Sequence, residues 1–274
     1  MAALRRGARR AARSHDGAAR MLKGEGLRVL LWRAAVLVGG LALWEAVARP
    51  LNPVLYVAPS RLPAALGRVL DVRELPALPG HVWLTVQEIT AAFALAVAAG
   101  LWLGFVLGLK PRVGRVYEPL LAALYAIPSV VWYPSLMLFF GLGAASKIAF
   151  GFLLGFFPIA LAVLAGIRQV PAHLVTVAVS MGARPWTVFW KVALPAMSAT
   201  LVGGLRAGLV LSVVGVLVGE ILGARSGLGY VINYAYGLLM TGEYVVLVVL
   251  VAAAVLLIDG LAALAEARVR RWAG

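Results

Sequence analysis

The sequence predicts an all-helical (all-α) membrane protein with six transmembrane segments. Of its 274 residues, 63% are hydrophobic and only 13% are charged, and the mean hydropathy is +0.95. An average soluble domain is about 45–50% apolar and about 25% charged. A water-soluble fold of this length could not hide so much apolar surface. The composition therefore excludes a soluble enzyme, a disordered tail and a fibrous repeat.

The apolar residues are gathered in six runs that are long enough to cross a bilayer. A spanning helix needs about 20 residues, because the hydrocarbon core is about 30 Å thick and a helix rises about 1.5 Å per residue. The expected spans are Val29–Ala48, Ile89–Leu109, Pro119–Phe140, Ile148–Ile167, Ala199–Leu222 and Tyr244–Leu264.

The basic residues indicate how these spans are oriented. The N-terminal tail, the links after the second and fourth spans, and the C-terminal end together hold 17 of the 25 Lys and Arg residues. The positive-inside rule places these regions in the cytoplasm, so both termini are expected there. An even number of spans leads to the same arrangement. The net charge of +14 is therefore interpreted as an orientation signal.

Residues 1–28 are expected to form a basic cytoplasmic tail that contacts anionic membrane lipid. The tail contains no Phe, Tyr or Trp on which bases could stack, so no nucleic-acid partner is expected. Ala46-Val47-Ala48 resembles a signal-peptide cleavage site, but the apolar stretch before it is long enough to span. The outer link 49–81 is too short for a separate domain, so residues 29–274 are expected to form a single transmembrane domain.

A second outer segment, Gly223 to Thr241, has a marginal length for a span. Arg225, Asn233 and the repeated glycines argue against its crossing the bilayer. Non-helical backbone survives at membrane depth only where protein or water covers it. We therefore expect an interfacial or re-entrant piece that packs on the bundle.

The cytoplasmic stretch at about 169–198 is long for a loop, and long loops are usually functional. Pro171 favours the first turn of a short helix, Gly182-Ala183 interrupts it, and Pro185 favours the start of a second one. Leu194-Pro195 is expected to end the second helix. The apolar positions that recur at helical spacing are Leu174, Val177, Ala178 and Met181 in the first helix and Trp186, Phe189 and Trp190 in the second.

Periodicity alone leaves two interpretations of this pair of helices open. The pair is either a docking element for a partner, with small residues at the bend for close approach, or an interfacial amphipathic anchor that only fixes depth in the membrane. In the second case the chain would be a structural or scaffolding membrane protein.

The order of residues in this stretch resembles the cytoplasmic signature loop of bacterial ABC-importer permeases. That signature reads Glu-Ala-Ala, three residues, Gly, nine residues, Ile, any residue, Leu-Pro. Ala178, Gly182 and Leu194-Pro195 match it, whereas Thr176, Val177 and Val192 depart from it. Further stretches resemble the permeases for nitrate, sulfonate, taurine and bicarbonate, namely Val57-Ala58-Pro59-Ser60, Ile127 to Gly143, Ser226 to Tyr230 and Asp259 to Trp272.

The resemblance implies a type I ABC-importer permease fold and a place in the bacterial inner (plasma) membrane. It implies a non-catalytic subunit that works with a second permease chain, two ATPase subunits that hold ATP and Mg²⁺, and an extracytoplasmic substrate-binding protein. The chain has no Gly-rich phosphate loop of the Walker type. The residues expected to couple to the ATPase are Thr176, Val177, Ala178, Gly182, Ala183, Arg184, Pro185, Leu194 and Pro195.

The same resemblance implies import of a small oxyanion such as nitrate, a sulfonate or taurine. Related permeases serve aromatic or vitamin-like compounds, so that class is the alternative substrate. Selectivity in such systems lies largely in the binding protein. The resemblance thus implies a transport machine without specifying its cargo.

Polar and aromatic residues at membrane depth are candidates for the translocation pathway, because such positions are costly and often functional. Proline can open backbone carbonyls toward a cavity, and packing between helices is the alternative role for the residues around it. Glu220 could instead pair with Arg225, and Arg206 could meet a substrate or a lipid headgroup. The candidate pathway residues are Tyr125, Ser129, Trp132, Tyr133 and Glu220.

No catalytic or metal site is expected. The three histidines are scattered, there is no cysteine, and no paired carboxylates are visible at membrane depth. Gly100, Gly104 and Gly108 recur every four residues in the second span and predict a tight helix-packing face.

Overall fold

The computed structural model describes residues 28–71, 78–108 and 111–273, and all regular elements in these ranges are helical. The chain forms two compact units, residues 1–64 and 65–274. The first contains the helix Arg28–Ala48. Apart from residue 28, the expected basic tail lies outside the described residues. That residues 29–274 form a single membrane domain stays a prediction.

Four of the expected spans in the second unit are single long helices. They are α3 (Leu78–Gly108), α6 (Ala144–Gln169), α10 (Ser198–Gly223) and α12 (Thr241–Ala273). Helix α3 begins well before the expected Ile89. Together with Arg28–Ala48, the described residues contain five helices long and apolar enough to span, or six if one bent pair counts as a span.

The third span is not continuous, and the expectation of one helix from Pro119 to Phe140 is wrong in this respect. Helix α4 (Pro111–Ala126) stops before Pro128, and after the short turn η2 (Ser129–Val131) the chain continues as α5 (Trp132–Phe140). The two halves are bent by 79°. Proline has no N–H for the helix ladder and disfavours helical backbone at the residue before it, here Ile127.

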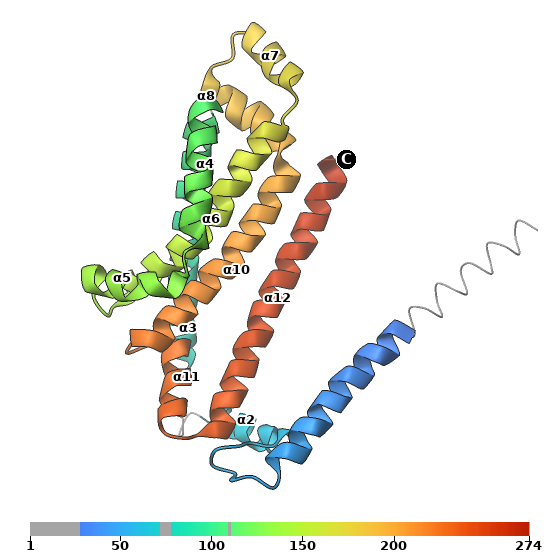
Figure 1. Ribbon diagram of the computed structural model, residues 1–274, viewed down its shortest axis with the longest axis vertical. Coiled ribbons are helices and arrows are strands. Elements are labelled where there is room, and N and C mark those ends of the chain that lie inside the picture. The colour runs from blue at the N-terminus through green and yellow to red at the C-terminus, as the bar shows by residue number, and fades with distance from the viewer. Residues whose placement is uncertain (1–27, 72–77, 109–110, 274) are drawn as a thin grey trace, which may run out of the picture. The chain divides into compact units, whose positions relative to one another are not determined.

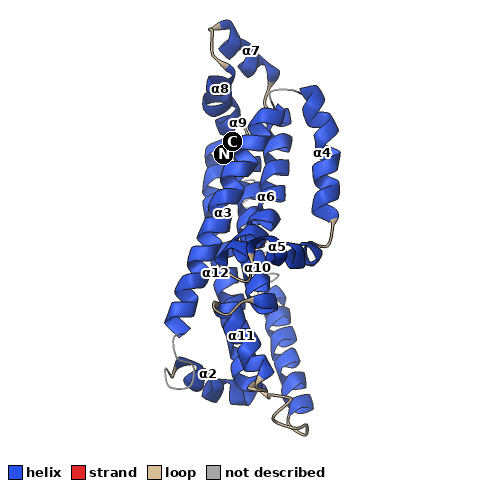
Figure 2. Cartoon of the chain, turned by 90° about the vertical axis from the view of Figure 1, so that its left-hand side faces the viewer, coloured by secondary structure: helices blue, strands red, loops and turns tan. Residues whose placement is uncertain are grey.

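Helix α6 packs against both α3 and α10 in the core of the second unit, as Figures 1 and 2 show. The packing face predicted from three glycines of α3 is confirmed. A Cβ atom built on Gly104 would lie 2.1 Å from Val163 Cγ1, so only a glycine lets the two helices approach this closely. Gly100, Gly104 and Gly108 face Ile159, Val163 and Ile167 of α6 in turn.

Helix α6 also meets α10 through a second glycine seam, which the sequence pattern did not single out. A Cβ atom on Gly155 would lie 2.1 Å from Ser212 Oγ, and one on Gly215 would lie 2.7 Å from the Cα of Gly151. Small residues on both helices let the backbones approach to near contact. Helices α3, α6 and α10 therefore form one tightly packed body.

The expected outer segment contains the short helix α11 (Leu228–Gly237). Ten helical residues extend only about 15 Å, which is too short to cross a bilayer. Figure 1 shows α11 at the end of the second unit opposite to α7 and α8. Val231, Ile232 and Ala235 are buried, so α11 packs on the bundle as expected.

We expect Gly104→Ala to destabilise the protein, because the added methyl group would overlap Val163 of α6. Overpacking of this kind costs about 1–3 kcal/mol. The control is Gly260→Ala in α12, where a Cβ atom meets nothing within 4 Å. Thermal unfolding in detergent should show a lower Tm for Gly104→Ala only. Equal Tm values for both variants would contradict the close packing.

Candidate functional site

The signature loop folds as the two short helices that the sequence predicts. Helix α7 (Ala172–Ser180) is followed by a turn at Gly182 and by α8 (Pro185–Val188). Gly182 has a φ of +80°. Its N–H donates to the carbonyl of Val179 at 2.9 Å, and the N–H of Ala183 donates to the carbonyl of Ala178 at 3.0 Å. This pair of bonds is a Schellman motif, in which glycine is the residue that adopts the left-handed conformation without strain.

The second helix ends at Ala196, one residue beyond the expected Leu194-Pro195. It widens into a π-helical turn, η3 (Phe189–Ala193), and continues as α9 (Leu194–Ala196). The N–H of Leu194 donates to the carbonyl of Phe189, five residues earlier. Pro195 has no N–H and would clash with the carbonyl four residues before it, and a widened turn accommodates its ring without breaking the helix.

Aromatic contacts attach the base of this loop to α3. The Phe105 ring lies 5.0 Å from Trp186 and 4.8 Å from Phe189, centroid to centroid, in edge-on arrangements. Phe189 is buried, and a cavity of about 450 Å³ lies beside it between the loop and the ends of α3 and α6. A displacement of the loop can therefore be passed to α3 through packed rings.

The outer surface of the loop is apolar and uncovered. Met181 is 82% exposed and Val177 57% exposed, and Leu174 is also on the surface. The predicted coupling residues Thr176, Gly182, Arg184 and Pro185 are also exposed, whereas Ala178 and Ala183 are half-buried. Pro185 and Ala183 line the cavity under the loop as well. Leu194 and Pro195 lie apart from them, on the far side of the π-helical turn.

Three of the five candidate pathway residues come together at the break in the third span. Tyr125, Ser129 and Trp132 line a cavity of about 310 Å³, with Pro128 between them. Leucine and phenylalanine side chains of α6 and α10 complete its wall. The lining contains no charged residue.

The other two candidates, Tyr133 and Glu220, are fully buried in this conformation. The Tyr133 hydroxyl donates to the carbonyl of Gly219 at 2.6 Å, and its ring packs 5.1 Å from Phe150. Tyr133 therefore joins α5 to α10. Its geometry corresponds to the packing alternative.

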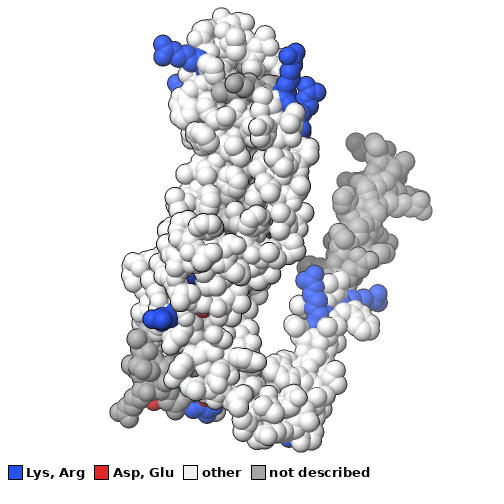
Figure 3. All heavy atoms as spheres, turned by 60° about the vertical axis from the view of Figure 1, so that its left-hand side comes forward, with Lys and Arg blue, Asp and Glu red and all other residues white. Residues whose placement is uncertain are grey.

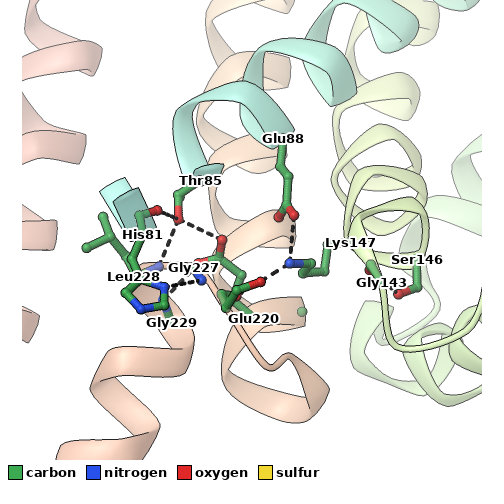
Figure 4. A network of polar contacts seen from close by, with 12 residues as sticks. His81, Thr85, Glu88, Gly143, Ser146, Lys147, Glu220, Gly227, Leu228 and Gly229 are labelled. Carbon is green, nitrogen blue, oxygen red and sulfur yellow. Dashed lines mark hydrogen bonds and ion pairs between the residues drawn. The ribbon is translucent and has the colours of Figure 1, made fainter. Parts of the chain in front are cut away.

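Glu220 belongs to a buried polar cluster at the α11 end of the bundle (Figure 4). Its carboxylate accepts a hydrogen bond from the Thr85 hydroxyl at 2.6 Å and one from the Gly229 N–H at 2.8 Å. The partner considered from sequence was Arg225, but these contacts come from α3 and α11. Thr85 and Gly229 were not singled out, because neither residue type signals a carboxylate partner.

A buried ion pair lies beside Glu220 in the same cluster. Lys147 Nζ of α6 is 2.6 Å from Glu88 Oε1 of α3, and each side chain is only 2% exposed. The sequence analysis did not propose this pair. Both residues stand near the ends of their spans that adjoin α11, and that shared level is the signal that could have suggested the pair.

Arg206 is fully engaged with acidic groups of α12. Its guanidinium contacts the two carboxylate oxygens of Asp259 at 2.7 Å each and Glu266 Oε2 at 3.1 Å. Asp259 of α12 is therefore paired with a base of α10. Arg206 contacts a protein carboxylate pair here, and this arrangement leaves the substrate and headgroup roles without support. Within the described ranges, no cluster of three or more His, Asp or Glu residues could hold a metal ion.

The fold and the loop define a helical membrane component with a signature segment at one end. Residues 96–271 match the family described as binding-protein-dependent transport system inner membrane component, and the chain belongs to this family. It is 37% identical over 158 residues to the riboflavin transport system permease protein RibX of Chloroflexus aurantiacus, covering 58% of this chain and 59% of that one.

Two further comparisons agree with the family. The chain is 30% identical over 195 residues to the taurine transport system permease protein TauC of Escherichia coli, covering 71% of this chain and 70% of that one. A solved structure of the methionine ABC transporter MetNI in inward-facing conformations matches with a TM-score of 0.50 and 25% identity, over 71% of this chain and 98% of the other. The chain spans 58% and 59% of the length of two of the curated relatives that it matches.

We expect Lys147→Met to be strongly destabilising, because it leaves the buried Glu88 carboxylate without its partner. Removing one member of a buried pair costs about 3–5 kcal/mol. The double variant Lys147→Met/Glu88→Gln should recover part of this loss, since the unpaired charge is gone. Denaturation of the purified protein measures both effects.

The matched control is Arg270→Met, which breaks the pair of Arg270 with Glu266 on the surface, where the Arg270 side chain is 63% exposed. Exposed pairs contribute about 0–1 kcal/mol. If Lys147→Met destabilises no more than Arg270→Met, the buried pair does not stabilise the bundle as described.

Proposed function

We propose that this chain is a non-catalytic transmembrane permease subunit of an ATP-driven ABC importer, and that residues 169–198 couple it to the ATPase. The observation that carries the proposal is the signature loop. Its exposed apolar surface stands at one end of the bundle, and its base is joined to α3 through Phe105. Membership of the transport-system family supports this interpretation over a scaffold with an interfacial hairpin.

The proposed assembly contains a second permease chain, two ATPase subunits that bind ATP and Mg²⁺, and an extracytoplasmic substrate-binding protein. We place it in the bacterial inner membrane with both termini in the cytoplasm. Figure 3 shows Lys and Arg side chains at the end of the second unit that carries α7 and α8, which supports a cytoplasmic position for that end.

The proposed coupling follows a continuous physical path. ATP-driven closure of the ATPase pair moves α7 and α8, and the aromatic contacts at Phe105 pass this motion to α3. Helices α3, α6 and α10 then move as one body, because they are closely packed along the glycine seams. The break at Pro128 separates α4 from α5 and gives the third span a point at which to bend.

We propose that Tyr125, Ser129 and Trp132 belong to the translocation pathway. Tyr133 and Glu220 do not line it in this proposal, and they hold the surrounding helices together. The first three line one cavity, and the break beside them frees backbone carbonyls for a passing solute. The burial of Tyr133 and Glu220 supports the second assignment.

The proposed substrate is a small oxyanion such as taurine, another sulfonate or nitrate, a class supported by the taurine-system relative. The alternative is an aromatic or vitamin-like compound. That class is supported by the riboflavin-system relative and by the uncharged, aromatic lining at Tyr125 and Trp132.

Thermal shifts of the cognate binding protein decide between these classes. We expect the panel of sulfonates, taurine and nitrate to raise its Tm, because a ligand that binds only the folded state stabilises it in proportion to the logarithm of its concentration. A shift with flavins and pyrimidines alone would select the alternative class.

Replacing Gly182 by leucine should uncouple transport. A Cβ atom at Gly182 meets nothing within 4 Å in this chain, so a bulky side chain would project toward the docked partner. The left-handed backbone adds strain of about 1–2 kcal/mol, which the fold can absorb. We expect normal membrane insertion, at least about tenfold lower uptake and weaker co-purification of the ATPase, since a clash at an interface costs several kcal/mol.

The control for this variant is Gly141→Leu, between α5 and α6. Gly141 also has a positive φ, +75°, and open space around its Cβ position, but it lies away from the loop. It should therefore show the backbone strain without the docking defect. Unchanged uptake and unchanged ATPase co-purification in Gly182→Leu would overturn the coupling proposal.

A further inference from the structure

Side chains of two other helices cap the start of α11. The first N–H groups of a helix have no partner within the helix, and a buried N–H group without a partner is costly. At α11, three successive N–H groups each donate to a side chain of another helix. The N–H of Gly227 donates to His81 Nδ1 at 3.0 Å, that of Leu228 to Thr85 Oγ1 at 2.8 Å and that of Gly229 to Glu220 Oε2 at 2.8 Å.

These three bonds hold the turn 226–229 in a shape that leaves no room for a larger residue. Gly227 has a φ of +106°, and a Cβ atom there would lie 2.0 Å from Glu220 Oε1. A Cβ atom on Gly229 would lie 2.6 Å from Glu220 Cβ. The carboxylate of Glu220 therefore fills the position against which the turn closes.

Neighbouring groups hold the same turn and position Glu220. The Thr85 hydroxyl lies between Glu220 and the carbonyl of His81, which is 3.1 Å away. Lys147, paired with Glu88, approaches the carbonyl of Ser226 at 3.4 Å. Figure 4 shows these side chains pointing toward the turn from α3, α6 and α10.

The cap is a separable contact. The three bonds to the turn are polar, so water can replace each of them when the turn leaves its place. Beside α11 lies a cavity of about 590 Å³ between α10, α11 and α12, lined by Ile232, Asn233, Tyr236 and Tyr244 among others. On this side α11 borders an open groove, so its surface there is not fixed by close packing.

We infer that His81, Thr85 and Glu220 form a latch that closes on the backbone N–H groups of 227–229, holds α11 against the bundle, and opens and closes during the transport cycle. Glu220 is the main positioning residue of this latch. The latch itself is a property of the single chain, and its opening in the cycle rests on the proposed function.

Cysteine labelling tests the latch directly, because the chain has no cysteine of its own. Ala235→Cys places a thiol on the buried side of α11, where Ala235 is 0% exposed. In the purified chain in nanodiscs, this thiol should react slowly with a polar maleimide. Adding Glu220→Ala should speed the reaction at least about tenfold, since a lost buried hydrogen-bond partner increases local opening by that order.

Two conservative variants separate the latch from a general loss of structure. Glu220→Gln keeps an oxygen for Gly229 and an amide for Thr85, so its labelling rate should stay within about threefold of the parent. Thr85→Val should speed labelling and Thr85→Ser should restore the slow rate.

Two glycine variants test the turn itself. Gly227→Ala should speed labelling as Glu220→Ala does. Gly237→Ala, at the other end of α11 where a Cβ atom meets nothing within 4 Å, should leave the rate unchanged.

The outcomes that overturn the latch are equally definite. Unchanged labelling in Glu220→Ala and Thr85→Val would do so. An equal rise at Ala96→Cys, a core position of α3 that is 0% exposed, would also do so, because it would show general unfolding.

Opening in the cycle is tested in the full complex with its ATPase. ATP and Mg²⁺ should raise labelling of Ala235→Cys at least about threefold over ADP, as expected for a shift between two populated states. An unchanged rate in a complex that hydrolyses ATP would overturn the opening step and leave the proposed function intact. Failure to capture any ATPase would instead overturn the proposed function and leave the single-chain labelling result standing.

Discussion

The second unit depends on the close approach of α6 to both α3 and α10. Lipid tails supply no hydrophobic force between helices, so association rests on close packing and polar contacts. Glycines on α3 provide the first contact, and glycines on α6 and α10 provide the second. This packing places Lys147 beside Glu88 at one end of α6. At the other end it places Ile167 beside the cavity under the signature loop.

Satisfaction of backbone polar groups explains the irregular parts of the same bundle. The widened turn before Pro195, the break at Pro128 and the start of α11 are all places where the helix ladder is interrupted. Each is resolved differently: by a bond five residues back, by a short turn, and by side chains of other helices. At each interruption the freed backbone groups therefore find another hydrogen-bond partner or a changed helix geometry.

The long helices and the two-helix loop could be predicted because hydropathy and proline and glycine positions are local signals. The glycine face of α3 was predictable from its spacing of four. The break at Pro128 was missed because the apolar run passes through it unchanged. The contacts of Glu220 were missed because Thr85 and Gly229 are brought to it by packing between helices, which has no signature in the spacing of residues along the chain.

The Schellman turn at Gly182 affects how a displacement passes between the signature loop and the helix bundle. Its two backbone bonds cap the end of α7 and fix the direction in which the chain leaves it, two residues before α8 begins. A connection with a fixed geometry transmits a displacement from the loop to the bundle and from the bundle to the loop. Linkage then requires reciprocity: if nucleotide binding by a docked ATPase biases the bundle, occupancy of the bundle biases nucleotide affinity by the same factor.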